Sequence, residues 1–175
     1  LIFMRRDTEM LKSLMKLDNL NTNILIHDDD PLLCYAIERN DLDFVKLMVG
    51  FKNTDLNIRM KNGKTPLILA IDCNNKDIVE CIVNDTKFDG TYLDLALFLT
   101  DNIDICKILL AKPEIDVNYF YHCDVNFDDA NVNDDLQTTL IHAVSKNNAE
   151  KVALIINHEK FDKEESLFPH ALSMA

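Results

Sequence analysis

A few groups of side chains in this sequence have the type and spacing that could bind a metal ion. Residues 124–135 carry Asp, Asn and Asp at the first, third and fifth positions, which is the rhythm of a calcium-binding loop. Such a loop needs a glycine at position six and a bidentate Glu at position twelve, and here Asp129 and Asp135 stand there. We therefore expect a hydrated acidic loop in place of a calcium site.

Histidine and cysteine are the other candidates for metal binding and for nucleophilic catalysis. His122 and Cys123 are adjacent, but structural zinc needs four ligands and no second His/Cys pair is nearby. A nucleophilic cysteine needs a base beside it, and His142 is the obvious candidate. Four cysteines stand among apolar neighbours in or beside helical patterns: Cys34, Cys73, Cys81 and Cys106. Free cysteine in such surroundings behaves as a small core residue, so we expect structural roles.

Runs of Asp could supply the paired carboxylates of general acid and base catalysis. They occur at residues 28–30, 128–129 and 134–135. Paired catalytic carboxylates need a shielded site that separates their pKa values, whereas Asp runs in loops are normally hydrated. We predict no catalytic residue, no metal site and no cofactor, and hence no enzyme unless a catalytic domain lies outside these residues.

The composition excludes further function classes. The 175 residues contain only three glycines, which lie far apart, so no glycine-rich loop can hold a nucleotide phosphate. The formal charge of −12 repels a nucleic acid backbone. Five cysteines without a C-x-x-C pair favour a reducing, intracellular and cytoplasmic location over a secreted disulfide scaffold. We expect no nucleic acid partner.

Targeting and membrane signals are also missing from the sequence. Apolar residues precede Arg5 and Arg6, which is the reverse of the order in a signal peptide. The apolar stretch at residues 95–99 is soon interrupted by polar residues, far short of the roughly 20 residues that span a bilayer. We expect a soluble protein without membrane insertion. The first residue, Leu1, suggests a fragment of a longer chain.

The elements that would position all these side chains come from an internal repeat. One pattern, anchored on an alanine, occurs five times: PLLCYA (31–36), TPLILA (65–70), TYLDLA (91–96), TTLIHA (138–143) and SLFPHA (166–171). In the first four copies a break containing Asn or Asp follows, and then a second apolar stretch with helical spacing at residues 43–49, 77–83, 104–110 and 150–156. Each unit therefore predicts two antiparallel helices joined by a tight turn, and neighbouring units must stack to share a core.

Start signals support both helices of each unit. A threonine followed by proline, Thr65 and Pro66, is typical of a helix start, and Thr91, Thr138 and Ser166 occupy the same place. An acid opens each second helix near the positive end of its dipole: Asp43, Asp77, Asp104 and Glu150. We expect these residues to be structural.

The sequence GKTPLILAIDCNNKDIVECIV (63–83) resembles an ankyrin repeat, whose core is G-x-T-P-L-H-x-A, with Ile68 at the histidine position. The resemblance implies an all-α, ankyrin-type solenoid of stacked antiparallel helix pairs. It also implies that His142, at the TPLH-like histidine position, holds turns together by hydrogen bonds. PEIDVN (113–118) and FKNTDLNI (51–58) resemble the family's approach to its β-hairpin finger. The high Asn and Asp content resembles proteins of compositionally biased, often protozoan, genomes.

The spacing of the anchor alanines departs from a regular array. The steps between residues 36, 70, 96, 143 and 171 predict hairpin fingers that are short or missing in places, with an acidic insertion at residues 119–134. The expected segments are an N-terminal helical cap or degenerate repeat at 1–30, with residues 9–20 as a possible second helix, then repeats at 31–64, 65–90, 91–137 and 138–165, and the start of a truncated repeat at 166–175.

The resemblance implies a non-catalytic module that binds another protein through its concave face and loop tips. We expect the most exposed contact residues in the first finger and in the insertion: Arg59, Lys61, Asn62, Lys64, Tyr119, Phe120, Tyr121 and Phe127. The insertion aromatics could instead fold back over the step between the third and fourth repeats. An alternative function is a structural component of a larger assembly, packed through the open ends of the stack.

Overall fold

The computed structural model describes residues 22–26, 30–122 and 136–164. The chain divides into two compact units, residues 1–89 and residues 90–175, and each is described by itself. The described residues contain four helix pairs, two in each unit, which confirms the predicted all-α class of antiparallel helix pairs. The expected helical cap at 9–20, the acidic loop at 124–135 with Phe127, and the truncated repeat at 166–175 lie outside the described residues.

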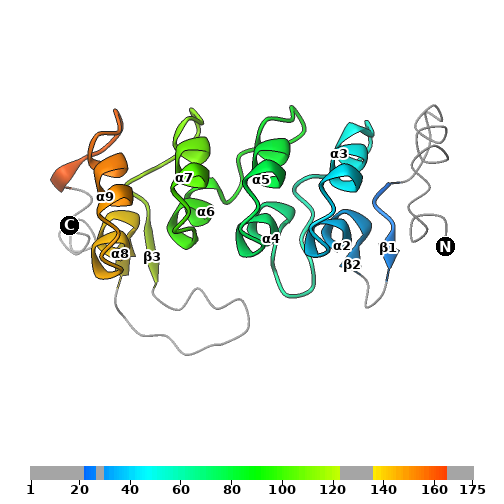
Figure 1. The fold of residues 1–175 in the computed structure, drawn as a ribbon, viewed down its shortest axis with the longest axis horizontal. Helices are drawn as coiled ribbons and strands as arrows, with labels where there is room; N and C mark the ends of the chain where they lie inside the picture. The colour runs from blue at the N-terminus through cyan, green and yellow to red at the C-terminus, as the bar shows by residue number, and fades with distance from the viewer. Residues whose placement is uncertain (1–21, 27–29, 123–135, 165–175) are drawn as a thin grey trace, which may run out of the picture. The chain divides into compact units, whose positions relative to one another are not determined.

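Unit 1 consists of two helix pairs and a short hairpin. The helices are α2 (Leu32–Glu38), α3 (Leu42–Gly50), α4 (Pro66–Asp72) and α5 (Lys76–Val83). Strands β1 (Leu25–Ile26) and β2 (Asp30–Pro31) pair antiparallel, with Leu25 opposite Pro31. The second pair stacks on the first, because α4 packs against α2 and α5 packs against α3 (Figure 1).

Unit 2 repeats this plan with a longer hairpin. Its elements are α6 (Leu93–Leu99), α7 (Ile103–Leu110), β3 (Phe120–His122), β4 (Leu136–Thr138), α8 (Thr139–Ser145) and α9 (Ala149–Ile156). Helices α8 and α9 pack against α6 and α7, respectively. Strands β3 and β4 pair antiparallel, with Tyr121 opposite Gln137, so the two ends of the predicted insertion meet in a hairpin.

In two of the four pairs, a threonine caps the start of the first helix, as predicted. The Thr65 hydroxyl accepts from the amide of Ile68 at 3.4 Å, and the Thr138 hydroxyl accepts from the amide of Ile141 at 3.3 Å. The prediction for Thr91 is wrong. Helix α6 is preceded by Tyr92 in a left-handed conformation with φ of 65°, in a turn that the amide of Leu93 closes on the carbonyl of Gly90.

The second helices are capped by the Asn or Asp that ends each break. These caps are the side chains of Asp41, Asn75, Asn102 and Asn148. The predicted acids do stand in the first turn of each second helix: Asp43, Asp77, Asp104 and Glu150. A side-chain cap is worth about 0.5–2 kcal/mol, so this repeated start signal contributes to the stability of every pair.

Three of the four turns between paired helices share one geometry, and the turn after α6 differs. Asn40, Asn74 and Asn147 adopt a left-handed conformation with φ of 54°, 50° and 55°, as is common just after a helix end. The turn after α6 also has three residues, but its first residue, Thr100, has extended backbone with ψ of 135°. The C-terminal carbonyls of α6 therefore need other donors.

An asparagine near the end of each finger approach ties successive repeats together. The Asn57 side chain donates to the carbonyl of Lys87 at 2.9 Å and accepts from the amide of Asp89 at 3.3 Å. Asn118 makes the same pair of bonds to Lys160 and Asp162, at 2.8 and 3.0 Å. Asn23 repeats them with residues 53 and 55. This asparagine is thus a structural residue of the D-L-N and D-V-N phrases.

Candidate interaction surfaces

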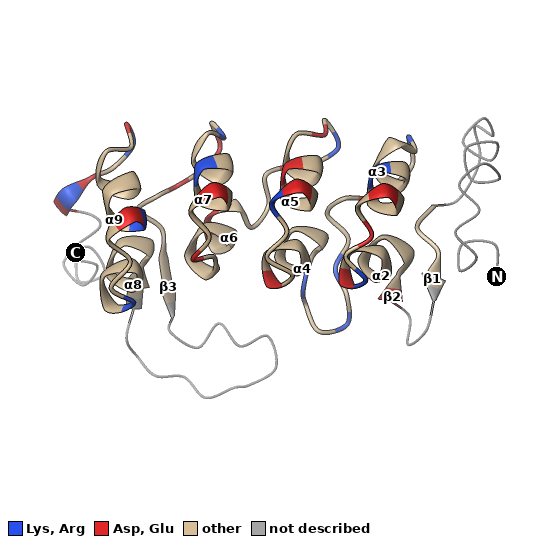
Figure 2. Cartoon of the chain, viewed as in Figure 1, with Lys and Arg blue, Asp and Glu red and all other residues tan. Residues whose placement is uncertain are grey.

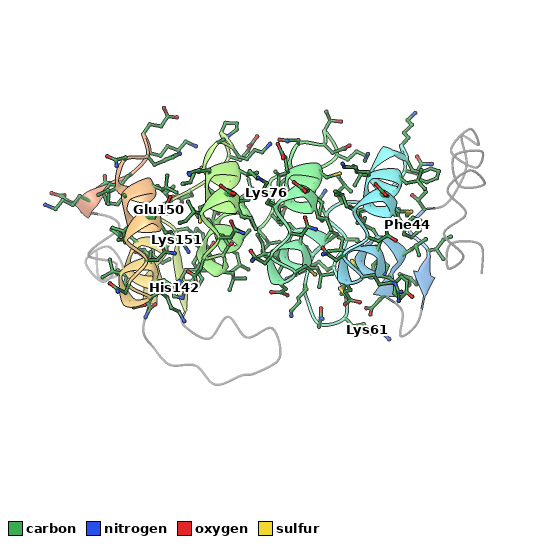
Figure 3. All side chains as sticks on the ribbon, in the orientation of Figure 1. Phe44, Lys61, Lys76, His142, Glu150 and Lys151 are labelled. Atoms are coloured by element: carbon green, nitrogen blue, oxygen red, sulfur yellow. The ribbon has the colours of Figure 1, made fainter. Side chains whose placement is uncertain are left out.

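The first predicted contact loop, residues 59–64, lies in unit 1 directly before α4. The amide of Met60 donates to the carbonyl of Lys64, and that of Gly63 donates to the carbonyl of Met60, both at 2.9 Å. Gly63 has φ of +79°, a left-handed conformation that favours glycine at this position of the turn. Lys61 lies toward the tip of this loop (Figure 3). The loop is therefore a closed turn with no strand, although it lies in the one step of standard length between anchor alanines.

The side chains of this loop are not all as exposed as predicted. Arg59 and Lys61 are exposed, whereas Asn62 and Lys64 are half-buried. The Asn62 carboxamide accepts from the amide of Lys64 at 3.0 Å, and the Lys64 ammonium pairs with Asp72 at 3.2 Å. The Arg59 guanidinium also donates to the carbonyl of Gly63 at 3.4 Å. Arg59 and Lys61 are nevertheless exposed and give the loop a basic tip, which Figure 2 shows in blue below α4.

The second predicted contact region is where β3 begins in unit 2. Tyr119 is 49% exposed, whereas Phe120 and Tyr121 are half-buried. The Tyr121 ring lies 4.8 Å from the ring of Phe98 on α6, and the Tyr119 ring lies 4.8 Å from that of Tyr121. Burial, followed by the charge of Asp94, raises the pKa of Tyr121 above its usual range. Tyr121 therefore folds back on the core, while Tyr119 faces solvent.

His142 is not a turn-binding residue of the expected kind. When the repeats are aligned on their anchor alanines, His142 corresponds to Leu69. The residue at the family's histidine position, filled by Ile68 in the second repeat, is Ile141. Its ring stacks on Phe98 with centroids 4.4 Å apart, and its buried Nδ1 has no hydrogen-bond partner. Burial, together with the charge of Lys151, lowers the pKa of His142. The ring therefore acts as a packing group.

The described cysteines have surroundings that disfavour nucleophilic chemistry. Burial raises the pKa of Cys34 to about 12 and that of Cys106 to about 11. Burial also raises the pKa of Cys73 and of Cys81, both of which are half-buried. Because the thiolate is the nucleophile, these four free thiols are poorly reactive at neutral pH.

Lys151 is a buried charge that the sequence analysis missed. It stands on α9 three residues after the helix cap, where the other pairs have Phe44, Ile78 and Ile105. Its Nζ donates to the carbonyl oxygens of Phe98 at 3.1 Å and Thr100 at 2.7 Å. These are C-terminal carbonyls of α6, which the extended backbone at Thr100 leaves without helical donors. The one signal in the sequence is a lysine at a repeat position that is otherwise apolar.

An open groove of about 450 Å³ lies between α7 and α9 of unit 2. Its lining is formed by Lys107, Leu110, Ala111, Glu150, Ala153, Leu154, Asn157 and His158. Lys107 and Glu150, at 3.9 Å, pair across it. Across residues 22–26, 30–122 and 136–164, no group of three or more His, Cys, Asp or Glu side chains is arranged to hold a metal ion.

A comparison with sequence families identifies the repeat. A model of ankyrin repeats in three copies matches residues 2–90 and residues 33–121. The chain belongs to the ankyrin repeat family. Ankyrin repeats generally mediate protein–protein interaction, and the family is typically a non-catalytic scaffold.

The ankyrin fold is also found among solved structures. The crystal structure of EF0377, an ankyrin repeat protein, is similar with a TM-score of 0.59 and 15% sequence identity. The similarity covers 90% of this chain and 95% of that one, and at this identity it concerns the fold. A search of curated proteins finds no match. Among the described helices of this ankyrin repeat chain, none has the length and apolar character needed to cross a membrane.

Proposed function

We propose that this ankyrin repeat chain is a non-catalytic interaction module, which binds a protein partner through its loop tips and the concave face that its first helices would line. Family membership carries the proposal, because ankyrin repeats generally bind proteins. The fold gives the place of binding and leaves the partner to the variable surface residues. The free cysteines support an intracellular, cytoplasmic site of action.

The loop tips have the residue types that serve as anchors in protein interfaces. Arg59 and Lys61 are exposed on a turn fixed by its own hydrogen bonds, and Tyr119 is exposed beside β3. Arginine and aromatic residues are enriched among the residues that dominate binding energy. A turn that is already ordered loses less conformational entropy on binding, which supports a contact role for these tips.

The test is affinity capture of binding proteins from the source cell, with the wild-type chain and matched variants as bait. We expect the specific partner to be lost with the double variant Arg59→Ala/Lys61→Ala or with Tyr119→Ala, while the melting temperature stays unchanged. Glu80→Ala on the outer helix α5 is the control, because Glu80 is exposed and far from the loop tips in sequence. Capture that is equal for all variants would contradict binding through the tips.

A second candidate function is assembly through the end of the helix stack, and one observation favours it. The residue after the anchor alanine is fully buried in the first pair of each unit, as Ile37 and Leu97. In the last pair the equivalent residue, Val144, is 60% exposed. Ile156 on α9 is 47% exposed, whereas the equivalent Val49 on α3 is 5% exposed. The face of α8 and α9 thus has apolar side chains at positions that a following helix pair covers elsewhere.

Light scattering tests the assembly candidate. We expect the chain to self-associate and the double variant Val144→Ser/Ile156→Ser to be monomeric at the same concentration. A wild-type chain that remains monomeric at all concentrations tested would contradict assembly between copies through this end.

A further inference from the structure

The exposed Tyr119 and the half-buried Tyr121 form an aromatic platform at the start of β3. The rings of Tyr119 and Tyr121 lie 4.8 Å apart with an angle of 46° between their planes. Tyr121 rests on Phe98, which is 5% exposed and also stacks on His142. Because the lower ring is fixed by the core, the half-exposed ring of Tyr119 is held in place before any partner arrives.

Two carboxylates, those of Asp94 and Asp116, act on this platform. Asp94 and Asp116 both act on Tyr121, adding to the effect of burial on its pKa. Asp116 is exposed, and one of its oxygens accepts from the amide of Asn118 at 2.9 Å, which fixes the direction of the carboxylate. Asp94 is half-buried and accepts from the amide of Asp116 at 2.8 Å. The platform therefore combines an aromatic face with negative charge.

Positive charge near the platform is sparse. The described residues 113–122 and 136–145 include no Lys or Arg, and they include the acids Glu114 and Asp116. Lys160 does act on Asp94, but its Nζ donates to the carbonyl oxygens of Pro113 and Ile115. Its charge is thus directed at main-chain acceptors, whereas the carboxylate of Asp116 is exposed to solvent.

From this geometry we infer that Tyr119, Tyr121 and Asp116 form a docking surface for a Lys- or Arg-rich segment of a partner protein. A guanidinium or ammonium group over the exposed tyrosine face gains a cation–π interaction, and the neighbouring carboxylate provides a charge-assisted hydrogen bond. An acidic segment would be repelled by the like charges of these carboxylates. The inference rests on the proposed interaction function and adds the chemistry of the partner.

The test uses the full chain and two synthetic peptides, one of alternating Arg and Gly and one of alternating Glu and Gly. Tyrosine fluorescence reports binding directly, because the chain has no tryptophan and four tyrosines, two of them in the platform. Calorimetry gives the dissociation constants. We expect the Arg peptide to bind with an affinity that falls as salt is added, and the Glu peptide to show no binding.

Three variants distinguish binding at the tyrosine platform from nonspecific attraction of the Arg peptide to an acidic protein. Tyr119→Ala keeps every charge and should weaken binding of the Arg peptide by about three- to tenfold, the range expected for a cation–π contact. Asp116→Asn keeps an oxygen acceptor for the Asn118 amide but removes one charge, and should weaken binding by a similar factor. Glu80→Gln removes one charge from exposed α5 and should leave the affinity within about twofold of the wild type.

Equal affinities for Tyr119→Ala and the wild type would overturn the inference, because attraction would then depend on net charge alone. Binding of the Glu peptide that is lost with Arg59→Ala/Lys61→Ala would overturn it in favour of the basic tip of unit 1. If Tyr119→Ala lowers the melting temperature, the variant Asp116→Lys replaces it in the test. Our inference requires that Asp116→Lys abolish binding of the Arg peptide, and retained binding would overturn it. If the Arg peptide fails to bind but the wild-type chain still captures a specific protein, the interaction function stands and only a Lys- or Arg-rich partner is excluded.

Discussion

The Nζ of Lys151 lies 2.7 Å from the carbonyl oxygen of Thr100, so a lysine of α9 completes the C-terminal end of α6. Lys151 is fully buried. The thiol of Cys106 also points to the Thr100 carbonyl, at 3.9 Å, and the carboxamide of Asn148 donates to the carbonyl of Asp101. The irregular turn of one helix pair thus depends on donors from the next pair, which couples the two pairs of unit 2.

Replacing Lys151 by isoleucine should destabilise unit 2, although isoleucine occupies the equivalent position in two other pairs. The change leaves the carbonyls of Phe98 and Thr100 buried without their donor, which costs about 1–3 kcal/mol for each unsatisfied group. Hydrogen exchange of the α6 and α9 amides and urea unfolding measure the loss. Lys107→Met is the control, since Lys107 is exposed and should change stability by less than about 0.5 kcal/mol. A more stable Lys151→Ile chain would show that the buried ammonium is a net cost.

His142 should make the stability of unit 2 sensitive to mild acid. Its pKa is lowered in the folded state, so between that value and about 6.5 the unfolded state binds more protons than the folded state. The stability that neutral His142 provides is therefore present above about pH 6.5 and is lost as the pH falls through the folded pKa. Between pH 7.5 and pH 5, the melting temperature of the wild type should fall more steeply than that of His142→Phe. Parallel curves would exclude this role of His142.

We expect Asn118 to contribute more to stability than its half-buried counterparts Asn57 and Asn23. It is 7% exposed and makes two hydrogen bonds to the main chain near α9, so Asn118→Ala should cost about 1–3 kcal/mol. Asn118→Asp keeps the acceptor for the Asp162 amide and loses the donor to the Lys160 carbonyl, and should cost less than the alanine variant. Asn157→Ala, which removes a bond from an exposed side chain, is the control. Chemical denaturation compares all three, and an unchanged midpoint for Asn118→Ala would show that water replaces both bonds.

Alkylation rates should order the described thiols by burial. Cys34 and Cys106 are fully buried with raised pKa values, so in the folded chain they should react with iodoacetamide only through unfolding. Cys73 and Cys81 are half-buried and should be modified first. Mass spectrometry of peptides after timed labelling at pH 8 gives the order. Early modification of Cys106 would show that the turn around Thr100 opens independently.

The repeat pattern predicted the helix pairs because apolar spacing and capping residues act locally. Thr65 and Thr138 cap helices as their sequence context predicts, and the four acids stand in the first turns as expected. The capping prediction for Thr91 failed because a left-handed turn at Tyr92 begins α6 instead. Lys151 could not be interpreted from its own neighbours, since its acceptors belong to residues about 50 positions earlier.

The candidate surfaces were only partly predictable for the same reason. The sequence pattern predicted the tyrosines and the basic loop as contact residues, but the burial of each side chain depends on contacts across the fold. Tyr121 is covered because Phe98 lies beneath it, and Lys64 is held by Asp72, whereas Tyr119 and Lys61 remain exposed. Which members of a motif face a partner is therefore decided by tertiary packing.

Site-specific photo-crosslinking in the source cell tests the interaction function most directly. A photoreactive amino acid is placed singly at position 61, 119 or 80, with the last on the outer helix α5 as control, and crosslinked products are compared by mass and by peptide sequencing. We predict that position 119, and also position 61, joins one defined protein partner while position 80 does not. Crosslinking of the same products from all three positions, or from position 80 alone, would contradict an interaction module that binds through its loop tips.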